Sequence, residues 1–212
     1  MNYFEIMNKC LVELGYKQVN VFAELTKNDH LKLKNIINII NNTVCRYDNW
    51  YFLMRKKQLE LESGNTEIPN TIDGRIIKVM IDNQEYDYLI NYEDFIGRTI
   101  PEKCFTVCGD KLIFPEFKNE KTISITYYTK NTAISADGTE KSMLEAETDT
   151  SLIPMPFVEP LLVYGSCMRL KANPQHVKFS YWYGMYKEAL SDMRAQISIS
   201  AKEMPLIKMH RK

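Results

Sequence analysis

The spacing of apolar residues changes twice along this chain, from helical to alternating and back to helical. Apolar residues recur every three or four positions in residues 1–49 and again in residues 153–198, which predicts amphipathic helices. Between about residues 50 and 130 they recur at every second position, as in half-buried strands. We therefore expect an α+β fold, in which a helical bundle is interrupted by a central antiparallel β-rich region.

Two helices are predicted in the N-terminal part of the bundle. The first covers Tyr3 to Leu14, and Gly15 can adopt the left-handed conformation that ends a helix. The second covers Asp29 to Tyr47. Its apolar stripe consists of Leu33, Ile36, Ile37, Ile40, Val44 and Tyr47.

The central region, residues 50–130, contains several short alternating segments. Strands are expected in "NWYFLMRKKQLELESG", on either side of Asn83-Gln84, and in "TISITYYT". The segments "CFTVC" and "KLIFP" flank Gly109-Asp110, a pair that suits a two-residue hairpin turn. Residues 131–152 are polar and lack periodicity, so we expect a long loop or arm there.

The C-terminal part of the bundle is predicted to be a helical hairpin, residues 153–198. Its first helix runs from near Phe157 to about Lys171, and its second starts at Asn173-Pro174 and ends near Ser198. The Phe157–Lys171 segment is apolar on all sides, so it needs cover on most sides. Either a central place in the bundle or a neighbouring subunit could provide that cover.

Both tryptophans, Trp50 and Trp182, lie in apolar patterns, so we expect them in the core rather than at a base-stacking surface.

The sequence carries no recognisable catalytic or metal-binding signature. Cys104 and Cys108 bracket a predicted strand and have no histidine near them, which does not match a zinc site. The five scattered cysteines suggest a reducing compartment, and neither a secretory signal nor an apolar run of about 18 residues is present. We expect no enzyme, no cofactor and no metal.

Charge is balanced, with 27 basic and 27 acidic residues, so bulk attraction to nucleic acid is absent. The densest internal basic cluster is Arg55, Lys56 and Lys57, which can protect a strand edge or face phosphates. The tail, residues 199–212, mixes charge with apolar side chains and either frays or orders on a partner. Its candidate docking residues are Met204, Leu206, Ile207, Met209 and Arg211.

The order of these segments resembles the head–tail adaptor, or connector, proteins of tailed phages, of the podoviral tail tubular protein A type. The resemblance covers nearly the whole chain: "ELGYKQV", "KLKNIINIINNTVCRYDNWYFLMRKKQLELESGNTEIPNTIDGRIIKVMID", "VCGDKLIFPEF", "ITYYTKN" and the closing "TSLIPMPFVEPLLVYGSCMRLKANPQHVKFSYWYGMYKEALSDMR".

The resemblance implies a structural virion protein that is assembled in the host cytoplasm. It would form a ring of about twelve copies below the portal protein, extend the DNA channel and carry the next tail component. DNA would pass without sequence-specific binding, and no membrane is involved. The alternative is a DNA-binding accessory protein of phage assembly, with Arg55, Lys56, Lys57 and the tail on one surface.

Overall fold

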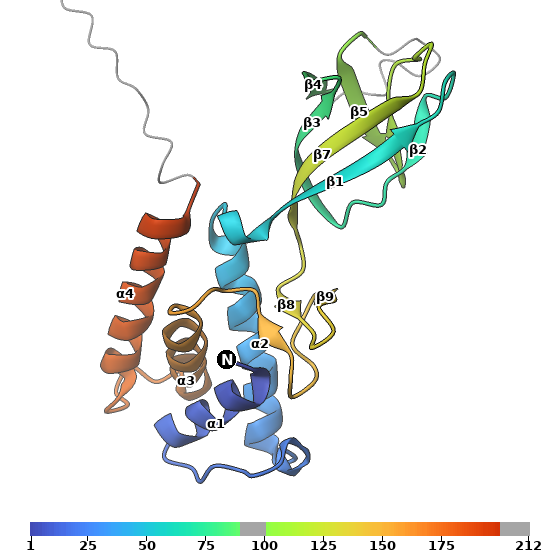
Figure 1. Cartoon of the computed structure of the whole chain (residues 1–212). Helices are drawn as coiled ribbons and strands as arrows, with labels where there is room; N and C mark the ends of the chain where they lie inside the picture. The colour runs from blue at the N-terminus through green and yellow to red at the C-terminus, as the bar shows by residue number, and fades with distance from the viewer. Residues whose placement is uncertain (90–100, 200–212) are drawn as a thin grey trace, which may run out of the picture. The chain divides into compact units, whose positions relative to one another are not determined.

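The computed structural model describes residues 1–89 and 101–199, and these form two compact units. The helical unit comprises Met1–Leu53 together with the chain from Asn131 onward. The β unit comprises Met54–Lys130 and is inserted into the helical unit. The expected α+β fold, with N-terminal helices, C-terminal helices and a central sheet, is confirmed (Figure 1).

The first helix, α1 (Tyr3–Glu13), starts with a capping box and ends with a glycine, as the sequence predicts. Asn2 accepts a hydrogen bond from the Glu5 amide, and the Glu5 carboxylate accepts one from the Asn2 amide. Gly15 has a φ of +80°, and the amide of Tyr16 donates to the carbonyl of Leu11 over 2.8 Å. This is the Schellman arrangement, which satisfies carbonyl groups that a helix end otherwise leaves unpaired.

The long helix α2 (Asn28–Tyr47) buries most of the predicted stripe. Leu33, Ile37, Ile40 and Val44 are buried, and Ile36 is half-buried. Tyr47 is 55% exposed, so its expected place in the core is wrong. A short 3-10 turn, η1 (Phe22–Glu24), lies between α1 and α2.

The helix that is apolar on all sides lies at the centre of the helical unit. Its first part is a π-helical segment, η4 (Pro160–Tyr164), which continues directly into α3 (Gly165–Lys171). It contacts α1 and α2 as well as α4, and Leu161, Leu162 and Cys167 are all fully buried. Elements of the same chain therefore provide the cover that this segment needs, and a neighbouring subunit is not required for it.

The last helix, α4 (Phe179–Ile197), begins later than expected. Residues 173–178 form turns, so the predicted start at Asn173-Pro174 is wrong. Trp182 and Met193 of the predicted stripe are buried, and Met185, Tyr186 and Ala189 are half-buried. The C-terminal helical pair is thus present, with a longer connection than the sequence indicates.

Residues 131–152, expected to be a loop or arm, instead form part of the packed helical unit. They contain β8 (Ala133–Ile134), β9 (Glu140–Lys141) and β10 (Thr150–Ser151), which make a small sheet in the order β10-β8-β9. The buried Asn41 of α2 donates to the carbonyl of Thr132 over 3.0 Å. Asn38, also of α2, donates to the Leu144 carbonyl and accepts from the Leu144 amide. These hydrogen bonds hold residues 131–152 against α2, although the segment itself has no periodic pattern of apolar residues.

The β unit is a seven-stranded, nearly closed sheet in the order β1-β7-β3-β4-β5-β6-β2. Its strands are β1 (Met54–Leu61), β2 (Glu67–Pro69), β3 (Gly74–Ile81), β4 (Gln84–Tyr88), β5 (Cys104–Cys108), β6 (Lys111–Ile113) and β7 (Lys121–Thr129). The predicted hairpin at Gly109-Asp110 is confirmed by the antiparallel pairing of β5 with β6. One strand pair departs from the expected antiparallel arrangement, because β4 pairs with β5 in parallel.

One face of the curved sheet encloses the core of the β unit. Ile123 and Ile125 of β7 are buried there with Val79, Ile81 and Phe114. The expected strand at Trp50 does not form, because Tyr51–Leu53 is a 3-10 turn (η2) that belongs to the helical unit. The alternation predicted for "NWYFLMRKKQLELESG" therefore begins only at Met54.

Both tryptophans are core residues, as predicted. Trp50 and Trp182 are fully buried, and each indole nitrogen has a hydrogen-bond acceptor. The Nε1 atom of Trp50 donates to the carbonyl of Val44 over 2.7 Å, and that of Trp182 donates to the Glu13 carboxylate over 3.1 Å. In the part of the chain that the structure describes, no helix is long and apolar enough to cross a membrane.

Candidate functional site

Three large apolar side chains are exposed at the start of α4 and in the turn before it, Val177, Tyr181 and Tyr183, and we call this set the α4 face; Tyr181 and Tyr183 flank the buried Trp182 on either side. These side chains are 96%, 51% and 46% exposed. The ring of Tyr181 packs edge-on against Tyr164, with a distance of 5.5 Å between centroids, and the ring of Tyr183 stacks on Phe179. Intramolecular packing therefore holds these rings in place while leaving them open to solvent, as in an interaction surface.

A second exposed apolar surface, the α2 face, consists of Leu31, Ile39 and Tyr47. The three side chains are 48%, 43% and 55% exposed. They are eight residues apart, so they spiral across the exposed side of α2 with Ile39 at its centre. Leu31 and Ile39 lie off the buried stripe of this helix, whereas Tyr47 lies about 20° from the buried Ile40 around the helix axis and is exposed at the end of the helix.

The α2 face and the α4 face lie on two helices that both pack against the central helix formed by η4 and α3. They differ in chemistry, because one is mainly aliphatic and the other mainly aromatic. The helical unit thus presents two different apolar surfaces that its own core does not use. Such a pair of surfaces can support head-to-tail association between identical subunits.

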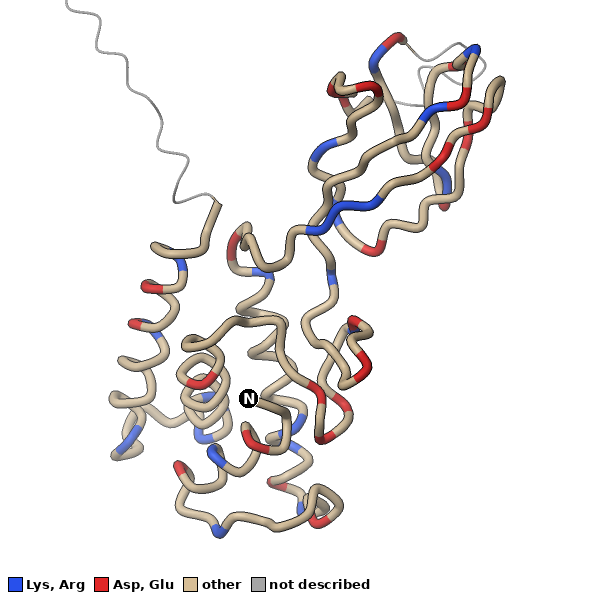
Figure 2. The backbone as a smooth tube through the Cα atoms, viewed as in Figure 1, with Lys and Arg blue, Asp and Glu red and all other residues tan. Residues whose placement is uncertain are grey.

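The predicted basic cluster lies on β1, a strand at one end of the sheet order (Figure 2). Side chains alternate along a strand, so Lys56 points to the opposite side from Arg55 and Lys57. Lys57 donates from Nζ to the carbonyl of Thr71 over 3.1 Å. The structure therefore brings no more than two of the three side chains to one face, and the edge position favours the interpretation as charges that protect a strand edge.

Lys56 borders a polar hollow of about 490 Å³ on the outer side of the sheet. It lies beside Thr126 of β7, which in turn pairs with Lys78 of β3. Lys78 forms an ion pair of 2.8 Å with Glu85, which offsets part of the positive charge. The remaining lining is mainly hydroxyl and amide groups, which can form hydrogen bonds but give no strong attraction for a polyanion.

The tail residues proposed for docking, Met204, Leu206, Ile207, Met209 and Arg211, lie outside the described residues. The docking role of these residues therefore stays a prediction.

Within the described ranges 1–89 and 101–199, no group of three or more His, Cys, Asp or Glu side chains could hold a metal ion, and all five cysteines are free thiols. Burial raises the pKa of the Cys10 thiol, and its hydrogen bond with Cys167 raises it further. Burial also raises the pKa of Cys45 to about 12. Thiols that stay protonated are poor nucleophiles, and these side chains act as small core residues.

No model of a known protein family matches this chain, and no curated protein matches it either.

Sequence reasoning missed the two apolar faces. The pattern around Trp182 selects the buried side of α4, but Tyr181 and Tyr183 are adjacent to Trp182 and therefore point about 100° away on either side. Leu31 and Ile39 likewise lie off the stripe of α2. The sequence does contain a signal for such surfaces: large apolar residues that lie outside the core stripe of a predicted helix.

Proposed function

We propose that this protein is a structural head–tail adaptor of a tailed phage. Copies of it would form a ring, of about twelve subunits by the resemblance, below the portal protein at the capsid vertex. The ring would extend the DNA channel and offer a platform for the next tail component. In this role the protein is part of the virion, acts without a cofactor and catalyses no reaction.

The observation that carries the proposal is the pair of different apolar faces on one helical unit. A closed ring is a heterologous assembly, in which one surface of each subunit contacts a different surface of the next. We assign the α2 face and the α4 face to these two surfaces; within the α4 face, Tyr181 and Tyr183 each pack against another ring of the same chain and remain partly exposed. The order of elements, helices around an inserted sheet, also agrees with the resemblance.

The zero net charge of the chain agrees better with a channel through which DNA passes than with a protein that binds DNA tightly. Lysines and arginines that neutralise phosphates strengthen binding, and a channel lined by many of them would retard the duplex. The chain has equal numbers of basic and acidic residues, and the cluster at 55–57 is divided between two sides of a strand.

The test is the particle mass of the purified protein, alone and with portal-bearing heads, compared with two variants. Ile39→Lys places a charge at the centre of the α2 face, so we expect it to abolish the ring-sized species. Met143→Lys is the matched control, because Met143 is similarly exposed, 47% against 43%, and lies outside both faces. Circular dichroism should show that both variants fold.

Two results would contradict the proposal. One is a wild-type protein that remains monomeric in both conditions and retards DNA with a steep salt dependence, which would favour the DNA-binding accessory protein. The other is a ring that forms equally well with Ile39→Lys and with Met143→Lys, which would remove the α2 face from the interface.

A further inference from the structure

The last described residues of the chain are fixed beside the end of α2 (Figure 1). The amide of Ile199 donates to the carbonyl of Asn49 over 2.9 Å, and the Nε atom of Arg194 donates to the carboxylate of Asp48 over 2.8 Å. Ser198, between these two anchor points, is fully buried. The tail beyond Ile199 therefore starts next to the C-terminal end of α2, within the helical unit.

The side of α2 that is closest to this starting point carries apolar side chains. Tyr47 lies two residues before Asn49, and Ile39 lies about two turns further back; they are 55% and 43% exposed. Ile36 is half-buried, and the three side chains fall within about 80° of each other around the helix axis. We call this set, Ile36, Ile39 and Tyr47, the α2 strip. It shares two residues with the α2 face.

The tail is long enough to cover the α2 strip. An extended chain advances by about 3.4 Å per residue, so Met204 can reach about 17 Å from Ile199, and Ile207 can reach about 27 Å. Along α2, Asn49 and Ile36 are about 20 Å apart. The large apolar residues of the tail can thus reach the whole strip; they are Met204, Leu206, Ile207 and Met209.

The order of charges in the two segments also agrees. Arg46 borders the α2 strip at its C-terminal end, is exposed and forms no ion pair among residues 1–89 and 101–199. The tail beyond Ile199 contains one acidic residue, Glu203, and its apolar residues follow directly. Glu203 can therefore face Arg46 while those apolar residues face the strip. At the other end of the strip, Lys32 and Asp29 carry opposite charges, so the basic end of the tail meets no net charge there.

We propose that the tail of the free subunit docks on the α2 strip of its own chain and covers part of the surface that the ring interface uses. A segment tethered at Ile199 competes for the strip at an effective concentration on the order of millimolar, well above that of other copies in dilute solution. Ring formation displaces the tail, because the next subunit occupies the same side chains, and frees it to dock on another protein. This consequence for assembly rests on the proposed function, whereas the contact itself can be tested without it.

The contact is tested by NMR on the full chain and on a chain that ends at Ile199, at a concentration at which light scattering shows that both are monomeric. Removal of the tail should shift the amide signals of Ile39 and Tyr47, because it uncovers the α2 strip. The amide signals of Tyr181 and Tyr183, on the α4 face, should not change.

Two full-length variants separate the loss of docking from the presence of a new chain end. Leu206→Asp combined with Ile207→Asp makes the centre of the apolar group charged, so it should reproduce the shifts that truncation causes. The matched control is Ser200→Asp combined with Ala201→Asp, which adds the same charge before the apolar group. This control should keep the wild-type signals of the α2 strip.

A charge reversal tests the predicted pairing of Glu203 with Arg46. Glu203→Lys places two positive charges opposite each other, so it should weaken docking about threefold, as measured by the size of the amide shifts. Adding Arg46→Glu to the same chain restores opposite charges and should restore the wild-type signals. A double variant that stays as weak as Glu203→Lys would remove this pair from the contact.

The consequence for assembly is tested by light scattering over a range of protein concentrations. The chain that ends at Ile199 should form the ring-sized species at about tenfold lower concentration than the full chain, if the tail covers the strip about nine-tenths of the time. The variant with Leu206→Asp and Ile207→Asp should behave in the same way. If no chain forms a ring under any condition, the proposed function fails, and the NMR comparison still decides whether the tail docks on α2.

Three results would overturn the inference. Unchanged amide signals of the α2 strip after removal of the tail would show that the tail does not dock there. Shifts that disappear on dilution of the full chain would show that the tail binds the strip of another copy instead. Equal assembly concentrations for the full chain and both altered chains would exclude competition between the tail and the ring interface.

Discussion

Gly165 of the central helix lies directly against the ring of Tyr186 of α4. A Cβ atom at position 165 would be 2.9 Å from Cδ2 of Tyr186 and 3.1 Å from Cγ2 of Ile40. Both neighbours are side chains that pack in the helical unit, so neither can move without disturbing a helix interface. The absence of a side chain at this position is therefore what allows α2 and α4 to approach the central helix closely.

Gly165→Val should destabilise the protein by about 1–3 kcal/mol, because the larger side chain overpacks this contact. Chemical denaturation measures the change. Gly184→Ala is the matched control, since Gly184 lies within α4 and a Cβ there has no atom within 4 Å. This control should be neutral or stabilising by up to about 1 kcal/mol. Equal losses in both variants would contradict the argument from close approach.

Trp50→Ala should lower the free energy of unfolding by about 3–5 kcal/mol, because it leaves a cavity in the core of the helical unit. The ring is fully buried and its Nε1 atom bonds to Val44. Trp50→Phe should cost less, since most of the volume remains and only the hydrogen bond is lost. A variant with unchanged thermal stability and a lost interaction with DNA would assign Trp50 to base stacking instead.

Acid should destabilise the helical unit through Asp149. Burial tends to raise the pKa of this carboxyl, but hydrogen bonds from the amides of Glu145 and Ala146, together with the charge of Lys141, lower it overall. A pKa that is lower in the folded state gives stability above about pH 3.9, the value in unfolded chains, and this stability is lost as pH falls through the folded value.

Asp149→Asn should therefore cost about 1–3 kcal/mol at pH 7, and its stability should fall less steeply than that of the wild type below pH 4. Stability is measured by urea denaturation at several pH values. Glu147→Gln, which changes an exposed carboxylate of the same segment, is the control and should follow the wild type. Parallel curves for the wild type and Asp149→Asn would exclude this carboxyl as the source of acid sensitivity.

Truncation of the tail should separate folding from docking if the cut is placed correctly. The amide of Ile199 donates to the carbonyl of Asn49 over 2.9 Å, and Ser198 is fully buried and forms a bridge with Trp50. A chain that ends at Ile199 should therefore fold with unchanged stability but fail to attach to portal-bearing heads. If it attached as well as the full chain, the docking role of Met204, Leu206, Ile207, Met209 and Arg211 would be excluded.

The sequence predicted the elements whose local pattern and packing agree. Gly15 and the spacing of Leu33, Ile37 and Ile40 identify α1 and α2, and Gly109-Asp110 identifies the hairpin of β5 and β6. In each case the local sequence pattern that favours the element agrees with its packing in the fold, so the local sequence was enough to predict the element.

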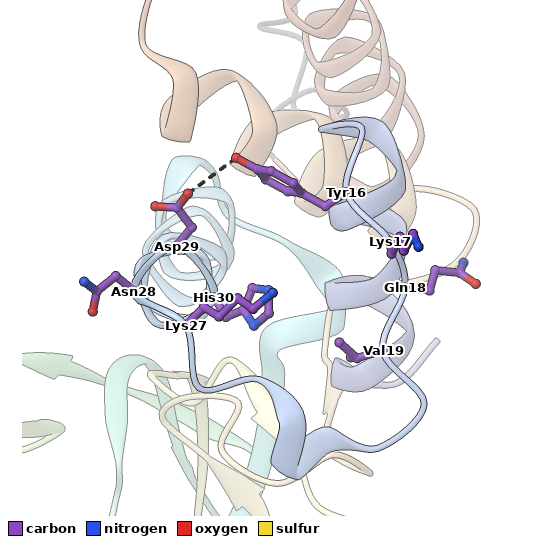
Figure 3. Close-up of a pocket in the computed structure, with 8 residues that line it drawn as sticks. All are labelled: Tyr16, Lys17, Gln18, Val19, Lys27, Asn28, Asp29 and His30. Carbon is purple, nitrogen blue, oxygen red and sulfur yellow. Dashed lines mark hydrogen bonds between the residues drawn. The ribbon is translucent and has the colours of Figure 1, made fainter.

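Prediction from the sequence failed where contacts between residues far apart in the chain decide the structure. The segment 131–152 has no periodicity, and side-chain bonds from Asn38 and Asn41 hold it in place. The parallel pairing of β4 with β5 is likewise not indicated by the residue pattern of either strand. The pocket lined by residues 16–19 and residues 27–30 (Figure 3) joins two segments whose proximity no local pattern indicates.

The β unit begins and ends at the same place. Met54, its first residue, pairs with Tyr128, two residues before its last residue, Lys130, so the chain enters and leaves this unit through neighbouring strands, in which paired Cα atoms are about 5 Å apart. A short linker can bridge such a gap, and a gene that gained, lost or exchanged this segment would leave the chain path of the helical unit unchanged.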